Sequence, residues 1–182
     1  QCVEFSDSLE SIPSNCFDGC TLLELRKFPN KLKHISGCAF RNCKNVNVRF
    51  HDSLEFIGDE AFKGSGIDSL IIPDKATVGT NNAFAECGNL IFAEFPTSFY
   101  YNHYYSPIRG CSNLRELMLK SPTVVGSSGG FRMLDGCPIN VVVKVPDYLV
   151  NAYKLDEYWY NFKIEGFSTE LVKNWEINQN LN

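Results

Sequence analysis

This sequence of 182 residues lacks any segment suited to crossing a membrane. No apolar run approaches the roughly 18 to 20 residues that span a bilayer. No basic segment followed by an apolar one opens the chain at Gln1, as it would in an export signal, and there is no initiator methionine, so we expect a chain trimmed at its start. These absences predict a domain that is not inserted into a membrane. They do not decide whether the protein is exported.

The sequence also lacks the motifs of common enzymes, including the P-loop, the dinucleotide fingerprint and H-E-x-x-H. The segment 126–130 satisfies G-x-S-x-G, but the esterase fold places its histidine after the serine, whereas all three histidines precede Ser128. The net charge of -4 and the absence of a recognition motif argue against nucleic acid as a partner. We therefore expect no catalytic residues, no cofactor and no nucleic-acid binding.

The composition is that of a folded domain, with 44% hydrophobic and 21% charged residues. Eight cysteines are too dilute for a scaffold held together by disulfides. The positions of the cysteines are more informative than their number, because most of them recur at a regular interval.

The most prominent feature is a repeat of about 23 residues, in which a small residue and Phe are followed by two variable residues and Cys or Ser. Clear copies are 16–20, 39–43, 61–65 and 83–87, and two weaker copies end at Cys111 and Cys137. The closing positions 20, 43, 65, 87, 111 and 137 are separated by 23, 22, 22, 24 and 26 residues. Six repeats therefore organise the chain.

Each repeat continues with an aliphatic residue two or three places after the Cys or Ser and then with alternating apolar residues, often closed by Pro. The aliphatic residues are Leu23, Val46, Ile67, Leu90, Leu114 and Ile139. Period-two alternation predicts half-buried strands at 70–73, 93–96, 117–119 and 143–146. Short return segments carry a second apolar pair, such as Leu54 with Ile57. One such coil cannot bury its own apolar edge, so the coils must stack into a curved solenoid with a parallel sheet.

These motifs resemble the BspA-like family of leucine-rich repeats, also called the Treponema pallidum type, whose repeat reads approximately I-G-x-x-A-F-x-x-C-x-x-L-x-x-I-x-I-P. Ile57-Gly58-Asp59-Glu60-Ala61-Phe62, followed by Ile67, Leu70, Ile72 and Pro73, is a close copy. The fifth repeat departs from the pattern with Ile108 in place of Phe, and the sixth with Leu134. The resemblance implies a right-handed coil and an extracellular or cell-surface protein that adheres to other macromolecules.

The domain boundaries follow from the extent of the repeat. We expect one leucine-rich-repeat domain over 1–164, with repeats at roughly 9–146 and a C-terminal cap at 147–164, and an extension at 165–182. Asp147 is the expected N-cap of a helix in the cap. The aromatic residues expected to cover the last coil are Tyr158, Trp159, Tyr160 and Phe162.

Cys20, Cys43, Cys87, Cys111 and Cys137 share one repeat position, so they should form an internal ladder of thiols. On parallel strands about 4.8 Å apart, their Cβ atoms are farther apart than the mean of about 3.8 Å in disulfides, so we expect free thiols. A zinc site built from Cys16, Cys20, His34, Cys38 and Cys43 is the weaker alternative. One disulfide among Cys2, Cys16 and Cys38 is also compatible with the spacing.

Charge forms the first candidate binding surface. Seven basic and no acidic residues lie between Arg26 and Arg49, whereas the rest of the chain holds 10 basic and 21 acidic residues. A positive end of this kind can attract an anionic partner such as a sulfated glycan or an acidic protein patch. The candidate contacts are Arg26, Lys31, Lys33 and Arg49; the alternative is an ordinary solvated face.

Two further surfaces are predicted. The segment 99–105 holds more aromatic residues than one coil can bury, so Tyr101, His103, Tyr104 and Tyr105 are candidate contacts for a protein or a sugar. The solvent face of the sheet should carry Ile71, Phe92 and Met118 among Glu94, Glu116 and Lys144. Aromatic packing between coils and ordinary surface scatter are the respective alternatives.

From these patterns we expect a monomeric, non-enzymatic recognition module that binds a protein or glycan at the cell exterior. The alternatives are a structural spacer within a larger surface protein and a carbohydrate-binding accessory module.

Overall fold

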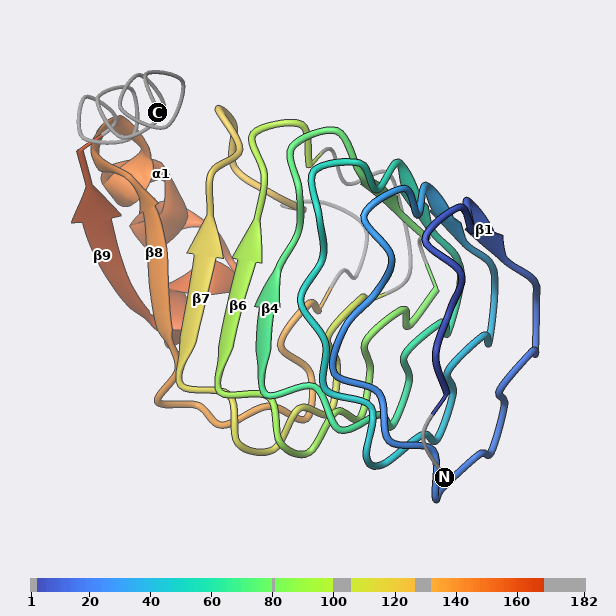
Figure 1. Cartoon of the computed structure of the whole chain (residues 1–182). Coiled ribbons are helices and arrows are strands. Elements are labelled where there is room, and N and C mark those ends of the chain that lie inside the picture. The colour runs from blue at the N-terminus through green and yellow to red at the C-terminus, as the bar shows by residue number, and fades with distance from the viewer. Residues whose placement is uncertain (1–2, 80, 100–105, 127–131, 169–182) are drawn as a thin grey trace.

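The computed structural model describes residues 3–79, 81–99, 106–126 and 132–168. The chain winds through about six stacked coils and ends in a small helical cap (Figure 1). Each coil consists of a return segment, a turn that contains the repeated Phe, and a main segment. The predicted solenoid with a parallel sheet and little helix is confirmed.

The main sheet follows the predicted alternation of apolar residues. Its strands are β4 (Ser69–Ile71), β6 (Phe92–Phe95), β7 (Glu116–Leu119), β8 (Val142–Pro146) and β9 (Lys163–Phe167). All neighbouring strands are parallel, in the order β4-β6-β7-β8-β9. The buried side chains Leu70, Ala93, Leu117 and Val143 lie in one register row, so the inward positions of successive coils stack directly.

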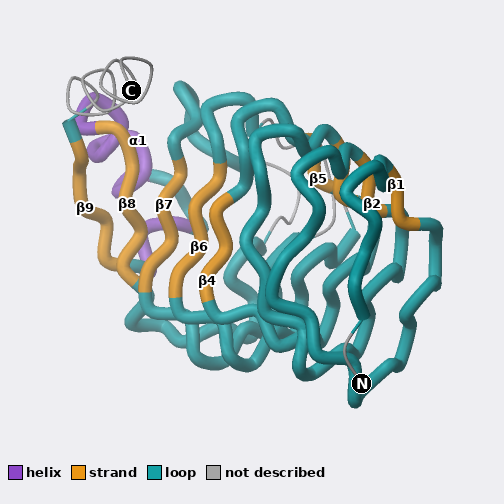
Figure 2. The backbone as a smooth tube through the Cα atoms, viewed as in Figure 1, coloured by secondary structure: helices purple, strands orange, loops and turns teal. Residues whose placement is uncertain are grey.

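The return segments form a second parallel strip that the alternation did not predict. Its strands are β1 (Ser11–Ile12), β2 (His34–Ile35), β3 (Phe56–Ile57) and β5 (Thr77–Val78). Figure 2 shows the two groups of strands on different parts of the solenoid, joined by loops. Two-residue strands are too short for a periodicity signal, which explains why the sequence indicated only return segments.

The main sheet does not extend regularly into the first two coils. A single bridge, Leu25 with Val46, joins their main segments. Between the second and third coils, side chains link the main segments: Asn47 Nδ2 donates to Asp68 Oδ2 at 2.7 Å, and Arg49 Nη2 donates to Asp68 Oδ1 at 2.9 Å. The expectation of one continuous sheet through all six coils was therefore wrong for this end.

The turns stack through their aromatic rings. Phe17, Phe40, Phe62 and Phe84 form a column whose successive centroids lie 5.2, 5.3 and 5.5 Å apart, with nearly parallel ring planes. Ile108 continues this column as a fully buried side chain, so the fifth coil tolerates the exchange of Phe for an aliphatic residue. Stacked rings and aliphatic side chains together make one continuous core.

A left-handed residue stands on each side of the Phe in several turns. Two places before it the backbone has positive φ at Asn15, Cys38, Glu60 and Asn82, and two places after it at Gly19, Asn42, Gly64, Glu86, Gly110 and Gly136. The two left-handed residues of such a turn lie four positions apart, with the Phe midway between them. The second variable position of the motif is therefore constrained by backbone conformation, although several residue types occupy it.

The thiols hold the turns of neighbouring coils together. Cys43 Sγ donates to the carbonyl oxygen of Phe17 at 2.9 Å, and Cys87 Sγ donates to that of Phe62 at 3.1 Å. Cys111 and Cys137 repeat the contact with Phe84 and Ile108 at 3.3 and 3.4 Å. Ser65, which occupies the slot in the third coil, is buried and contacts Cys87 Sγ at 3.5 Å.

All cysteines of the described residues are free thiols: Cys16, Cys20, Cys38, Cys43, Cys87, Cys111 and Cys137. A disulfide between Cys16 and Cys38 is therefore wrong, and Cys2 lies outside the described residues. Cys20 was expected in the internal ladder, but it is exposed because no earlier turn lies beside it. The buried members have the shape of small apolar residues with one hydrogen bond to donate.

The sixth coil has one residue more than the pattern assumes. Val141, not Ile139, occupies the inward position: Val141 is fully buried, and Ile139 is 68% exposed. In the fifth coil, Leu114 N–H donates a hydrogen bond to the carbonyl oxygen of Cys111. In the sixth coil, the corresponding bond runs from Val141 N–H to the carbonyl oxygen of Pro138, the residue after Cys137. The alignment of Ile139 with the aliphatic residues of the other repeats was therefore wrong.

The cap consists of the 3-10 helix η1 (Asp147–Leu149), α1 (Val150–Leu155), the 3-10 helix η2 (Trp159–Asn161) and β9. Trp159 and Tyr153 are fully buried, whereas Tyr160 is 63% exposed, so the prediction that Tyr160 covers the last coil was wrong. Asp147 is the first residue of η1 and makes no capping hydrogen bond, so it is not the predicted N-cap. Strand β9 runs to Phe167, beyond residue 164 where the sequence pattern ended the cap.

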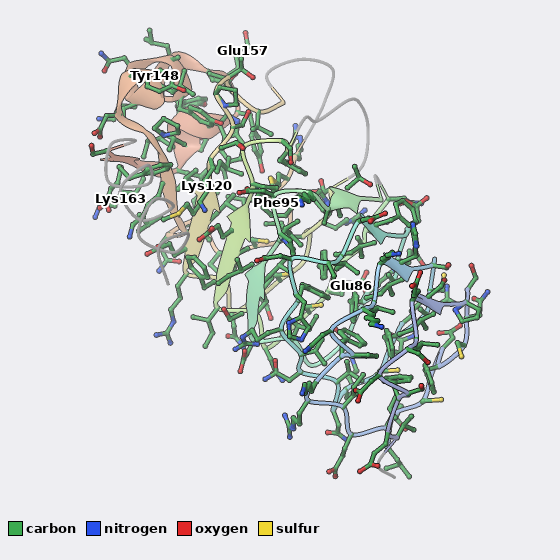
Figure 3. The ribbon with its side chains drawn as sticks, turned by 45° about the horizontal axis from the view of Figure 1, so that its top comes forward. Glu86, Phe95, Lys120, Tyr148, Glu157 and Lys163 are labelled. Carbon is green, nitrogen blue, oxygen red and sulfur yellow. The ribbon has the colours of Figure 1, made fainter. Side chains whose placement is uncertain are left out.

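The cap satisfies main-chain groups of the sixth coil. Tyr153 Oη accepts a hydrogen bond from Val125 N–H at 3.0 Å, and Trp159 Nε1 donates to Val125 C=O at 2.8 Å. Tyr158 Oη accepts from Leu134 N–H at 2.6 Å. The aromatic residues of the cap thus take the place that a further coil would have, at the opposite end from the first coils (Figure 3, with Tyr148 and Glu157 on the cap).

Candidate functional site

The solvent face of the main sheet carries two parallel rows of side chains. Strand register aligns Ser69, Phe92, Glu116, Val142 and Lys163 in one row, and Ile71, Glu94, Met118, Lys144 and Glu165 in the other. Because apolar residues alternate between the rows from strand to strand, they form a zigzag across the sheet. We call this the apolar track: Ile71, Phe92, Met118 and Val142.

The structure therefore brings together the three apolar residues that the sequence placed on this face. Ile71 is 48% exposed, and Phe92, Met118 and Val142 are half-buried. Sequence reasoning missed Val142. The signal was present, because alternation around the inward Val143 and Val145 requires Val142 to point outward.

The charged residues of the face neutralise one another. Lys144 Nζ lies 3.0 Å from Glu116 Oε1, Lys120 Nζ lies 2.5 Å from Glu94 Oε1, and Lys163 Nζ lies 2.6 Å from Glu165 Oε1. The first two pairs link neighbouring strands on either side of Met118. The charges beside the track are thus already paired. The track is therefore suited mainly to contact with apolar groups of a partner.

The basic run of the sequence is less positive in the structure than the sequence indicated. Lys33 pairs with Glu10 at 2.9 Å, Arg49 with Asp68 at 2.9 Å, and Arg41 reaches both Asp18 and Glu60. The hydrogen bond from Lys33 lowers the pKa of Glu10, and that from Arg41 lowers the pKa of Asp18.

Among the residues described, Arg26 and Lys31 form no ion pair. Lys27 and Lys44 also form no ion pair within this part of the chain, whereas neighbouring coils supply the acids that pair with Lys33, Arg41 and Arg49. The linear sequence does not show that proximity. An anionic partner would thus meet a smaller positive surface than the run of seven basic residues indicates.

The other predicted features fall partly outside the structure. Tyr101, His103, Tyr104 and Tyr105 lie outside the described residues, as does Ser128 of the G-x-S-x-G segment. The described part of the chain contains no group of three or more His, Cys, Asp and Glu side chains placed to hold a metal ion. None of the helices in the described part is long and apolar enough to span a bilayer.

These features define the class of protein as a leucine-rich-repeat solenoid. Residues 1–131 match the family described as BspA type leucine rich repeat region, in six copies. This chain belongs to that family, as its repeat motif indicated. No curated protein is significantly similar to the chain in sequence.

Two solved structures resemble the fold. One is the pneumococcal vaccine antigen PcpA, with a TM-score of 0.67 and 16% sequence identity over 90% of this chain and 41% of that chain. The other is a leucine-rich repeat protein from Bacteroides ovatus ATCC 8483, with a TM-score of 0.46 and 18% identity over 91% of this chain and 60% of that chain. This chain thus spans less than two thirds of either protein. The likeness to the antigen shows the shared fold alone.

Proposed function

We propose that this domain is a non-enzymatic recognition module at the cell exterior, which binds a protein through the apolar track of the main sheet. Families of leucine-rich repeats are typically non-catalytic, and one structurally similar protein is a pneumococcal vaccine antigen, which supports an exposed location. The observation that carries the proposal is the apolar track itself, whose neighbouring charged residues already pair with one another.

The physical argument concerns desolvation. A partner that covers the track buries Ile71, Phe92, Met118 and Val142 without stripping water from unpaired charges, because Glu94, Glu116 and Lys144 keep their partners. Met and aromatic residues are enriched at the centres of protein interfaces. The strands hold the side chains in place before binding, so little conformational entropy is lost.

The test is binding of the purified domain to immobilised extracellular-matrix proteins and to a glycan array. Met118→Glu places a third carboxylate between the two ion pairs at the centre of the track. We expect it to weaken binding to a protein ligand by at least tenfold, equivalent to about 1.4 kcal/mol.

Ile139→Glu is the matched control, because Ile139 is exposed outside the sheet and should tolerate the same change. Equal binding by Met118→Glu and the parent chain would contradict the role of the track. Binding to sugars alone would favour the carbohydrate-binding alternative, and binding to nothing on either panel would favour the spacer.

A further inference from the structure

The apolar track runs across the strands of the main sheet and not along them. Ile71, Phe92, Met118 and Val142 come from the neighbouring strands β4, β6, β7 and β8, which lie side by side in Figure 1. Neighbouring strands are about 4.8 Å apart, so the steps of the track add up to about 14 Å. The side chains alternate between the two rows, which are about 7 Å apart along a strand. A partner that covers the whole track therefore lies across the strands.

The main chain beneath the centre of the track is already hydrogen-bonded within the sheet. Strand β6 pairs with β4 and β7, strand β7 with β6 and β8, and strand β8 with β7 and β9. Another strand can add only where peptide groups are open. The partner is therefore recognised here through side chains, and strand addition is excluded at β6, β7 and β8.

The spacing of the track matches that of an amphipathic helix. Helix residues at i, i+3, i+7 and i+10 alternate on either side of one line and span about 15 Å, because the rise is about 1.5 Å per residue. An extended segment brings a side chain to one face only about every 6.7 Å, so the same number of contacts spans about 20 Å. The helix fits the track, and the extended segment is too long for it.

The charges on the two flanks of the track differ. Directly after β7, Lys120 is bound to Glu94. Directly before β7, Arg115 is exposed and forms no ion pair within the described residues, while its neighbour Glu116 is bound to Lys144. The flank beside Arg115 thus attracts an acidic group, whereas the opposite flank is neutral.

From this geometry we infer that the partner of the apolar track is an amphipathic α-helix of another protein. The helix lies across β4, β6, β7 and β8, with apolar residues at the spacing i, i+3, i+7 and i+10 and an acidic residue beside Arg115. This inference rests on the proposed function and adds the kind of partner to it. Met118 lies near the centre of the contact, where its flexible thioether adapts to the opposing side chain.

The experiment compares two alanine-based helical peptides of equal composition, each carrying a fluorophore. In the stripe peptide the leucines stand at i, i+3, i+7 and i+10; in the scrambled peptide the same leucines are distributed around the helix. Polarisation titrations up to about 1 mM measure their affinity for the domain. The stripe peptide should bind at least tenfold more tightly than the scrambled one. A proline in the middle of the stripe breaks the helix and should cost at least tenfold in affinity.

Variants of the domain locate the contact. Met118→Glu should weaken binding of the stripe peptide at least tenfold, whereas Ile139→Glu, outside the sheet, should leave it unchanged. A stripe peptide with glutamates on both flanks should bind about threefold more tightly than one with lysines, despite the net charge of -4 of the domain. Arg115→Glu should reverse this preference. Arg109→Glu is the matched control, because Arg109 is exposed in a turn, outside the sheet.

The outcomes separate this inference from the proposed function. Equal affinity for the stripe and scrambled peptides, no binding of the stripe peptide up to the highest concentration, or unchanged binding by Met118→Glu would each overturn the helix as partner. If the stripe peptide fails while a matrix protein binds and loses affinity in Met118→Glu, only the helix is overturned and the proposed function stands. Equal effects of Arg115→Glu and Arg109→Glu would overturn the acidic flank.

Discussion

Cysteine at position 38 illustrates how the turns constrain single residues. Cys38 has a φ of 57°, a left-handed conformation that costs a residue with a Cβ about 1 to 2 kcal/mol. The corresponding places in other coils hold Asn15, Glu60 and Asn82. Asparagine tolerates this conformation better than most residues, which accounts for its recurrence, whereas Cys38 and Glu60 are strained.

Cys38→Gly should therefore raise the free energy of unfolding by about 1 kcal/mol, because glycine adopts positive φ without steric cost. Urea unfolding followed by circular dichroism measures the change. Cys16→Gly is the matched control: Cys16 is another free thiol in a turn, but its φ is not positive, so glycine there should lower stability. A stability gain in both variants, or in neither, would contradict the argument from φ.

At the scale of elements, the second strip depends on the close approach of its glycines. A Cβ built on Gly58 would lie 2.5 Å from the main-chain nitrogen of Gly37, and one on Gly79 would lie 2.5 Å from that of Asp59. Successive return segments thus meet through backbone alone. This close approach explains the glycine that follows the isoleucine in the repeat.

Gly58→Ala should lower the free energy of unfolding by about 2 kcal/mol or more, since a main-chain atom cannot move aside as a flexible side chain can. Thermal and urea unfolding give the value. Gly88→Ala provides the comparison, because a Cβ there would meet nothing closer than Ser112 Oγ at 4.0 Å, and its effect should stay within about 0.5 kcal/mol. Equal losses in the two variants would show that the close contact does not matter.

The cap joins the solenoid through one buried acceptor in particular. Tyr153→Phe removes the oxygen that accepts the hydrogen bond from Val125 N–H and leaves a buried donor without a partner. We expect a loss of about 1 to 3 kcal/mol in unfolding free energy.

Tyr148→Phe removes the same hydroxyl from a side chain that is 61% exposed and should be nearly neutral. If Tyr153→Phe were equally neutral in urea unfolding, the cap would be held by its apolar contacts alone.

At the scale of the whole molecule, buried thiol and phenol groups make the free energy of unfolding depend on pH in the alkaline range. Burial raises the pKa of Cys87 from 9.0 to about 11 and that of Tyr153 from 10.0 to about 12. Because both values are higher in the folded state, their contribution is complete below the unfolded pKa values and is lost as the pH rises through the folded ones.

We therefore expect the unfolding free energy to fall between about pH 9 and pH 12, with Cys87 accounting for a loss on the order of 2 kcal/mol. Urea unfolding at pH 8 and at pH 11 measures this loss. Cys87→Ser keeps a small hydroxyl of the kind that Ser65 already places in the third coil, but it does not titrate in this range. An identical pH dependence in this variant would show that the thiol is not its source.

The sequence predicted the turns and the inward residues well, because each depends on a local pattern that recurs every 22 to 26 residues. Phe40, Phe62 and Phe84 stack as their shared position requires, and Ile71, Phe92 and Met118 lie on one face as alternation requires. The extra residue of the sixth coil was not predictable in this way, because Pro138 shifts the inward position to Val141 without changing the pattern around it.

The sequence by itself determined that the chain winds into stacked coils with one hydrophobic interior, since a repeated apolar period leaves each coil unable to bury its own edge. Only the tertiary structure decided which charges pair, as for Arg49 with Asp68, and which carbonyl group each buried thiol reaches, as for Cys87 with Phe62. These features depend on contacts between coils, whose residues lie about one repeat apart in the chain. Their register is set by packing of the whole solenoid and not by any local run of residues.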